Sequence, residues 1–387
     1  MNGIATDMAG DADEKSRATN LPRDYYVSEA IFQEELRKIF QRQWLTVGHI
    51  GLLPNPGDFY VKQVGPESMI FIRDDTGRIR AYFNVCRHRG YRIMDDGAAG
   101  CARGFVCPYH HWTYDLDGKL RKVPGTTDRR HFPFDAFPLH EAICETWHGF
   151  IYVWMGKETP PPLAEVLGPI TNEAAMQVCQ PERMKLAHRE IYLLDSNWKA
   201  MMENDMECYH CGHGGHPSLA IACNYQGFYA DDGGPSALAQ QQQQERQHFP
   251  LRGGMKSFSM NGERVCAKPL GTAEDGFSAG FILWPMFCGP VMFVDHAVSL
   301  ELTPLSVGRS HFVCEWYVHE DAVEGVDYQL DKLIAVFDVT NREDKAFGER
   351  NYRGMQSSRF EPGPLHPLRE DGVIMAYDAY RAMMAAD

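Results

Sequence analysis

The sequence predicts an α+β protein with two domains, a small all-β domain followed by a larger domain of mixed helices and strands. Short β-like runs punctuated by glycine dominate residues 46–156. Three consecutive prolines at 160–162 then break regular structure, as is common at a domain boundary. Beyond them, helical and strand patterns are interspersed. A chain of 387 residues also exceeds the usual size of one domain.

The same patterns set the boundaries of each element. Residues 1–20 are predicted to be a disordered N-terminus, and 21–45 a helical segment that packs on the body, because apolar residues recur near helical spacing from Ile31 to Phe40. The all-β domain covers 46–156, and the second domain covers 157–387. Within the second domain we expect a helix near 198–210, strands near 280–318 and a long helix from about 325 to 350. The glutamines at 240–243 predict a solvated insertion or, alternatively, a loop over a pocket.

Composition excludes several classes of protein. Lys and Arg number 38 against 52 Asp and Glu, so a net charge of −14 argues against nucleic acid as a partner. The first twenty residues lack the basic and apolar regions of a secretory signal. No apolar run approaches the roughly 18 residues of a membrane span. The sequence therefore predicts a cytoplasmic protein, whose 11 dispersed cysteines are buried thiols and metal ligands rather than disulfides.

Four residues in the all-β domain have the spacing of metal ligands. Cys86 and His88 form a C-x-H pair, and Cys107 and His110 form a C-x-x-H pair 18 residues further on. Two thiolates and two imidazoles suit tetrahedral zinc, or a [2Fe-2S] cluster in which histidines replace two cysteines on one iron. Cys101 lies between the pairs but has no histidine three residues later, so it is the weaker candidate.

A second group of candidate ligands lies in the other domain. Residues 197–217 read NWKAMMENDMECYHCGHGGHP and predict a helix with Glu207 and His210 on one face and His216 after a glycine-rich turn. Two histidines and one carboxylate, with positions left open for oxygen and substrate, form the facial triad of non-heme Fe(II) oxygenases. His213 is an alternative to His216 if the helix continues.

Together these segments resemble the catalytic (alpha) subunit of Rieske-type non-heme iron oxygenases. The resemblance rests on CRHRGYRIMDDGAAGCARGFVCPYHHWTYDLDGKL, on WHGFIYVWM at 147–155, and on an E-x3-D/E-x2-H-x4-5-H motif fitted by Glu203, Glu207, His210 and His216. It implies a Rieske [2Fe-2S] domain joined to a helix-grip catalytic domain of the START/Bet v1 type, in which a curved antiparallel sheet grips a long helix. It also implies one cluster and one mononuclear Fe(II) per subunit.

The resemblance also implies the remaining site residues. VTNREDKAFGERNYRGMQSS at 339–358 resembles the late helix that carries the third iron ligand, for which we choose Asp344. The alternatives are Glu343, Asp338 and Glu349. Glu207 takes the position of a carboxylate that bridges His210 and a Rieske histidine of the neighbouring subunit. That partner would be His110, which requires a ring of subunits, typically a homotrimer.

The resemblance further implies an O2-dependent reaction driven by a partner protein. Since the chain contains neither G-x-G-x-x-G nor a Walker motif, a separate NAD(P)H-dependent flavin and iron–sulfur reductase should donate the electrons. An electron carrier with only a Rieske cluster is the non-enzyme alternative, but it has no need of the second histidine-rich segment.

The substrate prediction rests on short segments. ECYHC in the iron-binding segment and KSFSMNG at 256–262 resemble the branch that oxidises quaternary ammonium compounds such as glycine betaine, carnitine and stachydrine, often by N-demethylation. A quaternary cation favours an aromatic cage. Phe281, Trp284, Phe287 and Phe293 are the candidates for it. Hydroxylation of an aromatic ring or aromatic acid is the alternative reaction within the same enzyme class.

Overall fold

The computed structural model describes residues 18–126, 129–211, 214–223, 251–283, 287–288 and 290–386. The chain divides into two compact units. One is Phe40–Leu163, and the other combines Met1–Ile39 with Ala164–Asp387. The sequence predicts a boundary at 156/157 and one helical segment over 21–45. In the structure that segment is divided between the two units.

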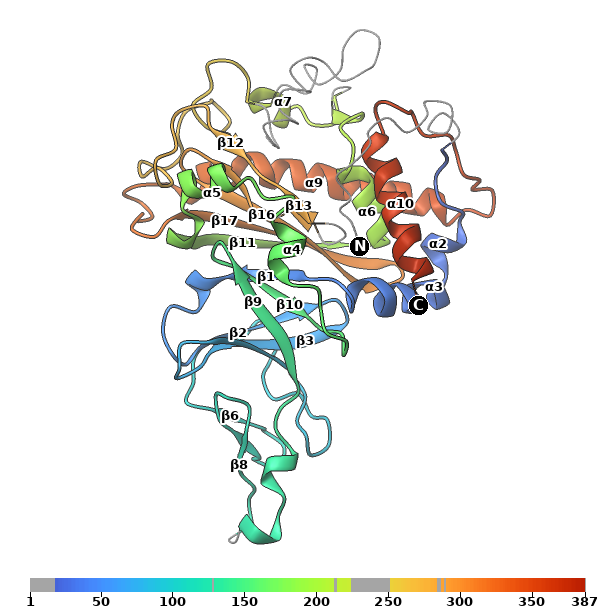
Figure 1. The fold of residues 1–387 in the computed structure, drawn as a ribbon. Helices are drawn as coiled ribbons and strands as arrows, with labels where there is room; N and C mark the ends of the chain where they lie inside the picture. Colours follow the sequence, from blue (N-terminus) through green and yellow to red (C-terminus); the bar gives the residue numbers. More distant parts are fainter. Residues whose placement is uncertain are drawn as a thin grey trace. The chain divides into compact units, whose positions relative to one another are not determined.

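The unit Phe40–Leu163 is built on an antiparallel sheet in the order β1-β10-β9-β4-β3-β2-β5 (Figure 1). A two-residue turn at 65–66 joins β2 to β3, with Gly65 at φ +57°, the left-handed region that such a turn requires. A smaller sheet, β6-β7-β8, stands apart from the main one. The strands are β1 (Leu45–His49), β2 (Asp58–Val64), β3 (Glu67–Arg73), β4 (Ile79–Phe83), β5 (Ala99–Cys101), β6 (Phe105–Val106), β7 (Thr113–Tyr114), β8 (Leu120–Lys122), β9 (Glu141–Trp147) and β10 (Phe150–Trp154).

A single apolar core connects the two sheets of this unit. Ile70 and Ile72 of β3 pack with Phe105 of β6 and with Tyr114 of β7, and each of these side chains is nearly inaccessible to solvent. Full burial of such a side chain contributes roughly 1.5–3 kcal/mol. This core also contains Cys86 and Cys107, so the sheet packing fixes the loops that carry them.

The other unit contains a curved antiparallel sheet in the order β11-β17-β16-β15-β12, with the hairpin β13-β14 beside it. Its long helix α9 (Leu330–Met355) lies along this sheet (Figure 1). Tyr192 of β11 donates a 2.7 Å hydrogen bond to Asp338 of α9. The predicted α+β fold, in which a curved sheet grips a long helix, is therefore confirmed. The strands are β11 (Met184–Leu194), β12 (Ser278–Ala279), β13 (Ile282–Leu283), β14 (Phe287–Cys288), β15 (Val291–Phe293), β16 (Ala297–Ser306) and β17 (Arg309–His319).

Shorter helices complete this unit. Ser28 accepts a hydrogen bond from the backbone N–H of Ile31 and so caps α3, but the helical segment predicted over 21–45 contains a π-helical turn at Leu36–Phe40. No helix in the described part of the chain combines the length and apolar character needed to cross a membrane. The helices are α2 (Asp24–Val27), α3 (Glu29–Glu35), α4 (Leu163–Leu167), α5 (Glu173–Cys179), α6 (Trp198–Asp205), α7 (Leu219–Ala222) and α10 (Asp371–Ala385).

Candidate metal centres

Two loops of the β unit carry the four predicted cluster ligands. Cys86 and His88 follow β4, and Cys107 and His110 lie between β6 and β7. The backbone closes both loops in the same way. Each cysteine N–H donates to the carbonyl five residues later, and each cysteine carbonyl accepts from the N–H four residues later, with a donor–acceptor distance of 2.9 Å in every case. The two loops are therefore matched halves of one site.

The four side chains meet as one group of donors. The thiols of Cys86 and Cys107 are buried in the same apolar core. The rings of His88 and His110 lie nearer the surface, with centroids 4.6 Å apart. Two inner thiols and two outer imidazoles fit a [2Fe-2S] cluster with one cysteine-bound and one histidine-bound iron. The residues present therefore suit the group that the resemblance implies.

Aromatic side chains hold these loops in place. Tyr114 lies 3.3 Å from the Cys86 sulfur through its hydroxyl and accepts a 3.1 Å hydrogen bond from the Arg87 N–H. Trp112 stacks on His88 at 4.7 Å between centroids. Burial raises the pKa of the Cys86 thiol, whereas the hydrogen bond from Tyr114 opposes this shift. A bound metal would add a much larger effect, because it deprotonates a coordinating thiol.

The candidate iron ligands follow α6, which ends at Asp205 and does not continue to 210 as the sequence predicted. The last backbone hydrogen bond of the helix comes from its C-cap residue, Met206. Glu207 then begins a separate turn, because its carboxylate accepts hydrogen bonds from the backbone N–H groups of Tyr209 and His210. Glu207 and His210 therefore share a turn, not the helical face that the sequence predicted.

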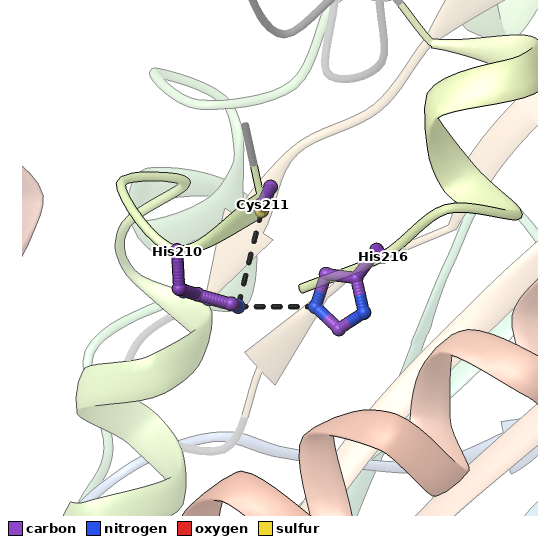
Figure 2. A group of neighbouring side chains, drawn as sticks. All are labelled: His210, Cys211 and His216. Atoms are coloured by element: carbon purple, nitrogen blue, oxygen red, sulfur yellow. Dashed lines mark hydrogen bonds between the residues drawn. The ribbon is translucent and has the colours of Figure 1, made fainter. Parts of the chain in front are cut away.

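Three donor atoms from distant parts of this unit converge on one point. The Nε2 atoms of His210 and His216 lie 3.0 Å apart. Asp344 of α9 places Oδ1 at 2.9 Å from the His216 Nε2 and at 3.4 Å from the His210 Nε2. His216 and Asp344 are both buried. Figure 2 shows the imidazole of His216 directed toward that of His210.

A carboxylate holds the far side of each imidazole. Glu207 Oε1 lies 2.6 Å from the His210 Nδ1, and Glu343 Oε2 lies 2.9 Å from the His216 Nδ1. If each Nδ1–H donates to its carboxylate, both Nε2 atoms present lone pairs to each other and to Asp344. Three electron-pair donors at this separation repel one another unless a cation lies between them. The arrangement is the one expected of histidines that bind a metal.

The electrostatics of the centre lead to the same conclusion. Burial lowers the pKa of the His210 imidazole, but its neighbours, with Asp344 first among them, outweigh burial and raise the pKa to about 12. Burial raises the pKa of the Asp344 carboxyl, and the two imidazoles bring it below its ordinary value. The three donors therefore favour a bound positive charge. A metal ion supplies that charge better than protons do, because one ion binds all three donors at once. The donor set of two imidazoles and one carboxylate fits non-heme iron.

The structure separates the four acids considered for the third ligand position. Asp344 is the one that reaches both imidazoles. Glu343 contacts only the far side of His216. Asp338 accepts the hydrogen bond from the β11 tyrosine described above, and Glu349 accepts a 3.0 Å hydrogen bond from a backbone N–H at the end of β11. His213, the alternative to His216, lies outside the described residues.

Three neighbours of this centre were not predicted from the sequence. Asn204 of α6 donates a 2.6 Å hydrogen bond to Asp344 Oδ1. Cys211 places its sulfur 3.9 Å from the His210 Nε2. The Phe347 ring lies edge-on to both imidazoles, at centroid distances of 5.8 and 5.7 Å. In the sequence, Cys211 directly follows His210, and Phe347 lies one turn after Asp344 on a predicted helix. No comparable sequence signal marks Asn204.

A pocket of about 510 Å³ opens beside His210. Glu207 lines it together with Glu203, which is largely buried, and with Phe347. The Glu207 side chain that contacts the imidazole is thus also accessible from this pocket. The remaining lining residues are Asn20, Ala200, Asn204, Gly348, Arg350, Asn351, Leu365, Glu370 and Val373.

The four aromatic residues predicted to form a substrate cage are only partly described. Phe281 is buried, with 4% of its surface exposed. Phe293 is buried and stacks on Phe258 at 4.8 Å between centroids. Trp284 and the side chain of Phe287 lie outside the described residues. The cage remains a prediction.

Comparison with known proteins agrees with this architecture. Residues 181–386 match the family described as the ring hydroxylating alpha subunit (catalytic domain), and residues 43–133 match the Rieske [2Fe-2S] domain. The glycine betaine monooxygenase oxygenase subunit of Pseudomonas aeruginosa is 31% identical over 393 residues, which cover 96% of this chain and 90% of that protein. The carnitine monooxygenase oxygenase subunit of Escherichia coli is 30% identical over 205 residues, 52% of this chain and 54% of that protein.

Solved structures share the fold. The quaternary ammonium Rieske monooxygenase CntA in complex with L-carnitine matches with a TM-score of 0.74 and 23% identity, covering 96% of this chain and 97% of that chain. Naphthalene 1,2-dioxygenase from Rhodococcus sp. bound to indole matches with a TM-score of 0.70 and 16% identity, covering 95% of both chains.

The chain therefore belongs to the Rieske non-heme iron oxygenases. It is an O2-dependent oxygenase component that carries a Rieske [2Fe-2S] cluster and a mononuclear iron. The two relatives named above are oxygenase subunits, which implies that a separate reductase delivers the electrons and that the substrate is a small molecule.

Proposed function

We propose that this oxygenase removes a methyl group from a small quaternary ammonium compound of the betaine type. The observation that carries this proposal is the similarity to glycine betaine monooxygenase oxygenase subunits along 96% of the chain. Ligand assignment is part of the proposal. Cys86, His88, Cys107 and His110 would hold the cluster, and His210, His216 and Asp344 would hold the iron.

The protein contributes positioning and charge to this chemistry. When bound, the cluster supplies electrons one at a time and the iron activates O2 beside the substrate. His210, His216 and Asp344 would hold the iron, and a donor set of two imidazoles and one carboxylate would leave positions for oxygen and substrate. Glu207 and Glu343 fix the tautomers of the two imidazoles, and a hydrogen bond from Asn204 orients the aspartate.

The expected reaction inserts one oxygen atom into a C–H bond of an N-methyl group. O2, two electrons and two protons convert the methyl carbon to a hydroxymethyl group and release one water. The hydroxymethyl ammonium then loses formaldehyde and a proton, and the electron pair of the broken C–N bond stays on nitrogen. The product is a tertiary amine, so formaldehyde reports directly on N-demethylation.

We further propose that electrons come from an NAD(P)H-dependent flavin and iron–sulfur reductase and pass between subunits of a homotrimer. In this route His110 of the neighbouring subunit would meet Glu207. Two observations support it. The Tyr109 side chain beside His110 is 52% exposed at the tip of the ligand loop. Glu207 lines an open pocket while holding His210.

The test compares substrates in the reconstituted enzyme. The purified, reduced protein would be titrated without O2 with glycine betaine, carnitine, stachydrine and a set of aromatic acids, while the mononuclear iron is followed spectroscopically. O2 is then added and formaldehyde is measured. We expect a betaine to perturb the iron signal and to yield formaldehyde. A response to aromatic acids alone would move the assignment to ring hydroxylation.

Two variants complete this test. Asp344→Asn should abolish formaldehyde release through loss of the mononuclear iron, with the cluster retained. Asp338→Asn lies on the same helix and serves as the control, because its carboxylate contacts Tyr192 and not the iron ligands. If the Asp344 variant retained both iron and activity, the ligand assignment would be wrong.

A further inference from the structure

The mononuclear centre has a thiol directed into it that the proposed function does not use. Cys211 follows His210 directly in sequence, and Figure 2 shows its sulfur facing the same space as the two imidazoles. The donor atoms of His210, Cys211 and His216 all lie within 4.8 Å of one another. Only 4% of the Cys211 surface is exposed. A buried thiol in this position faces the two imidazoles, not the solvent.

We propose that Cys211 is a fourth protein ligand that allows Zn²⁺ to bind this centre and close it. The inference rests on the proposed iron ligands His210, His216 and Asp344. With Cys211 added, the set becomes two imidazoles, one carboxylate and one thiolate. Zinc is bound by these donor types, and four protein ligands around zinc form a closed, tetrahedral site.

The distances permit this coordination after a small adjustment. Zn–N bonds of about 2.0–2.1 Å and a Zn–S bond of about 2.3 Å place a nitrogen and a sulfur roughly 3.6 Å apart on a tetrahedral ion. The Cys211 sulfur now lies 3.9 Å from the His210 Nε2. A shift of a few tenths of an ångström would bring the sulfur to the coordinating distance from His210, and a rotation of the Cys211 side chain would have to bring the sulfur closer to Asp344 as well, because Asp344 is not among the donors that lie within 4.8 Å of it.

Zinc binds a cysteine as its thiolate. On zinc binding, Cys211 would form the Zn–S bond and release its proton to solvent.

The centre would thus have two alternative states, one with iron bound and one with zinc bound. Zinc lies above Fe²⁺ in the general affinity order of divalent metals, and thiolate favours it further. An ion held by four protein ligands lacks the open positions that O2 and substrate require, and zinc does not change its oxidation state. Zinc would thus inactivate the centre, and its affinity would be higher with Cys211 as a fourth ligand than with three ligands alone.

X-ray absorption at the zinc edge tests the coordination without interference from cluster iron. The full-length protein with its cluster intact would be freed of mononuclear iron by a chelator, loaded with one equivalent of Zn²⁺ and measured as wild type, Cys211→Ser and Cys223→Ser. Wild type and Cys223→Ser should show one sulfur at about 2.3 Å besides nitrogen and oxygen neighbours. Cys211→Ser should show no sulfur. Cys223 is the control because it is a buried thiol of the same region.

Competition with iron gives a second, independent measurement. Zinc affinity should fall in Cys211→Ser by at least the roughly 10- to 100-fold that follows loss of a supporting group at a metal site. Iron affinity should change much less. Far-ultraviolet circular dichroism verifies that each variant is folded, because the cluster lies in the other unit.

The outcomes separate this inference from the proposed function. Wild-type zinc surrounded only by nitrogen and oxygen would overturn the role of Cys211 and leave the iron ligands intact. Zinc that binds equally well to His210→Ala would overturn both, because the metal would then be bound elsewhere. Unchanged zinc affinity in Cys211→Ser would also overturn the inference.

Discussion

Two adjacent acids on α9 carry out different tasks at the mononuclear centre. Asp344 faces the Nε2 atoms of both imidazoles, whereas Glu343 accepts a hydrogen bond on the far side of His216. We expect Asp344→Asn to lose the iron and Glu343→Gln to retain it with an affinity reduced about 10- to 100-fold. Iron content after dialysis against graded chelator measures both. Equal retention in the two variants would contradict the division of tasks.

Glu203 makes the stability of the protein depend on pH. Burial raises the pKa of its carboxyl from 4.5 to about 7, and hydrogen bonds from Tyr26 and Tyr377 and the charge of Lys199 oppose this shift only in part. Because the folded pKa is the higher one, the folded state holds a proton that the unfolded state has released between pH 4.5 and about 7. Stability from this residue is therefore complete below pH 4.5 and is lost as the pH rises to about 7.

Glu203→Gln should remove this dependence. The pKa difference corresponds to about 3 kcal/mol, so above pH 7 the amide variant should be more stable than wild type by an amount of that order. Thermal unfolding midpoints of both proteins between pH 4.5 and 8 provide the measurement. Glu370→Gln, a half-buried acid lining the same pocket, is the matched control. Parallel pH profiles for wild type and Glu203→Gln would count against a neutral, buried Glu203.

At the scale of elements, α9, which carries Asp344, and α6, which precedes His210, differ in how far the sequence predicted them. The buried residues of α9 recur every three or four positions, and Asp344 falls on that stripe between Asn341 and Gly348. This buried stripe sets Asp344 apart from Asp338 and Glu349, whereas the sequence indicated Asp344 only through the family resemblance. The end of α6 could not be found in this way, because Glu207 competes for backbone N–H groups through its side chain, a local effect that periodicity does not contain.

The paired cluster loops use a left-handed residue at equivalent positions. Gly90 has φ +75°, and His111 has φ +56°. A side chain added at Gly90 would meet no atom closer than 4.0 Å, so backbone strain is the main effect. We expect Gly90→Ala to destabilise the cluster loop by roughly 1–2 kcal/mol, and His111→Gly to be neutral or stabilising. Thermal loss of the visible cluster absorption measures both. A destabilised His111→Gly would show that its side chain, not its backbone, matters.

A buried ion pair joins three helices that are distant in the sequence. Glu35 of α3 lies 2.6 Å from the Lys199 nitrogen of α6 and accepts a 2.6 Å hydrogen bond from Tyr380 of α10. Both charged side chains are fully buried. Glu35→Gln should therefore destabilise the protein by about 3–5 kcal/mol, because it leaves the lysine charge unpaired.

The double variant Glu35→Gln with Lys199→Met is the control for this pair. It removes both charges, so it should recover much of the loss. Urea unfolding of the single and double variants gives the coupling energy. Additive losses would mean that the pair does not act as a unit. Since α6 leads directly into the turn that carries His210, we also expect reduced iron retention in the single variant.

At the scale of the whole molecule, the order of motifs along the chain predicted the fold better than composition did. Composition and proline placement indicated only a β-rich part, a linker and a mixed part. The sheet order and the contact of Asp344 with His210 and His216 depend on long-range packing that no local pattern contains. The roles of Glu343 and Cys211 could not be predicted for the same reason, since both depend on atomic distances between segments.

The proposed route of electrons between subunits makes Glu207 the residue that connects the two metal centres. Glu207→Ala should retain the cluster and should bind iron with an affinity reduced about 10- to 100-fold, because the residue holds His210 without being a ligand, yet at saturating iron it should still lose most of its turnover. Single-turnover reoxidation of the cluster with substrate and O2 present should slow in parallel. Glu370→Gln, in the same pocket, should behave as wild type. Because the route needs a neighbouring subunit, dilution that dissociates the oligomer should reduce wild-type turnover to the level of the Glu207 variant. Full activity of Glu207→Ala, or of a dissociated subunit, would require a path for electrons that does not pass through this carboxylate.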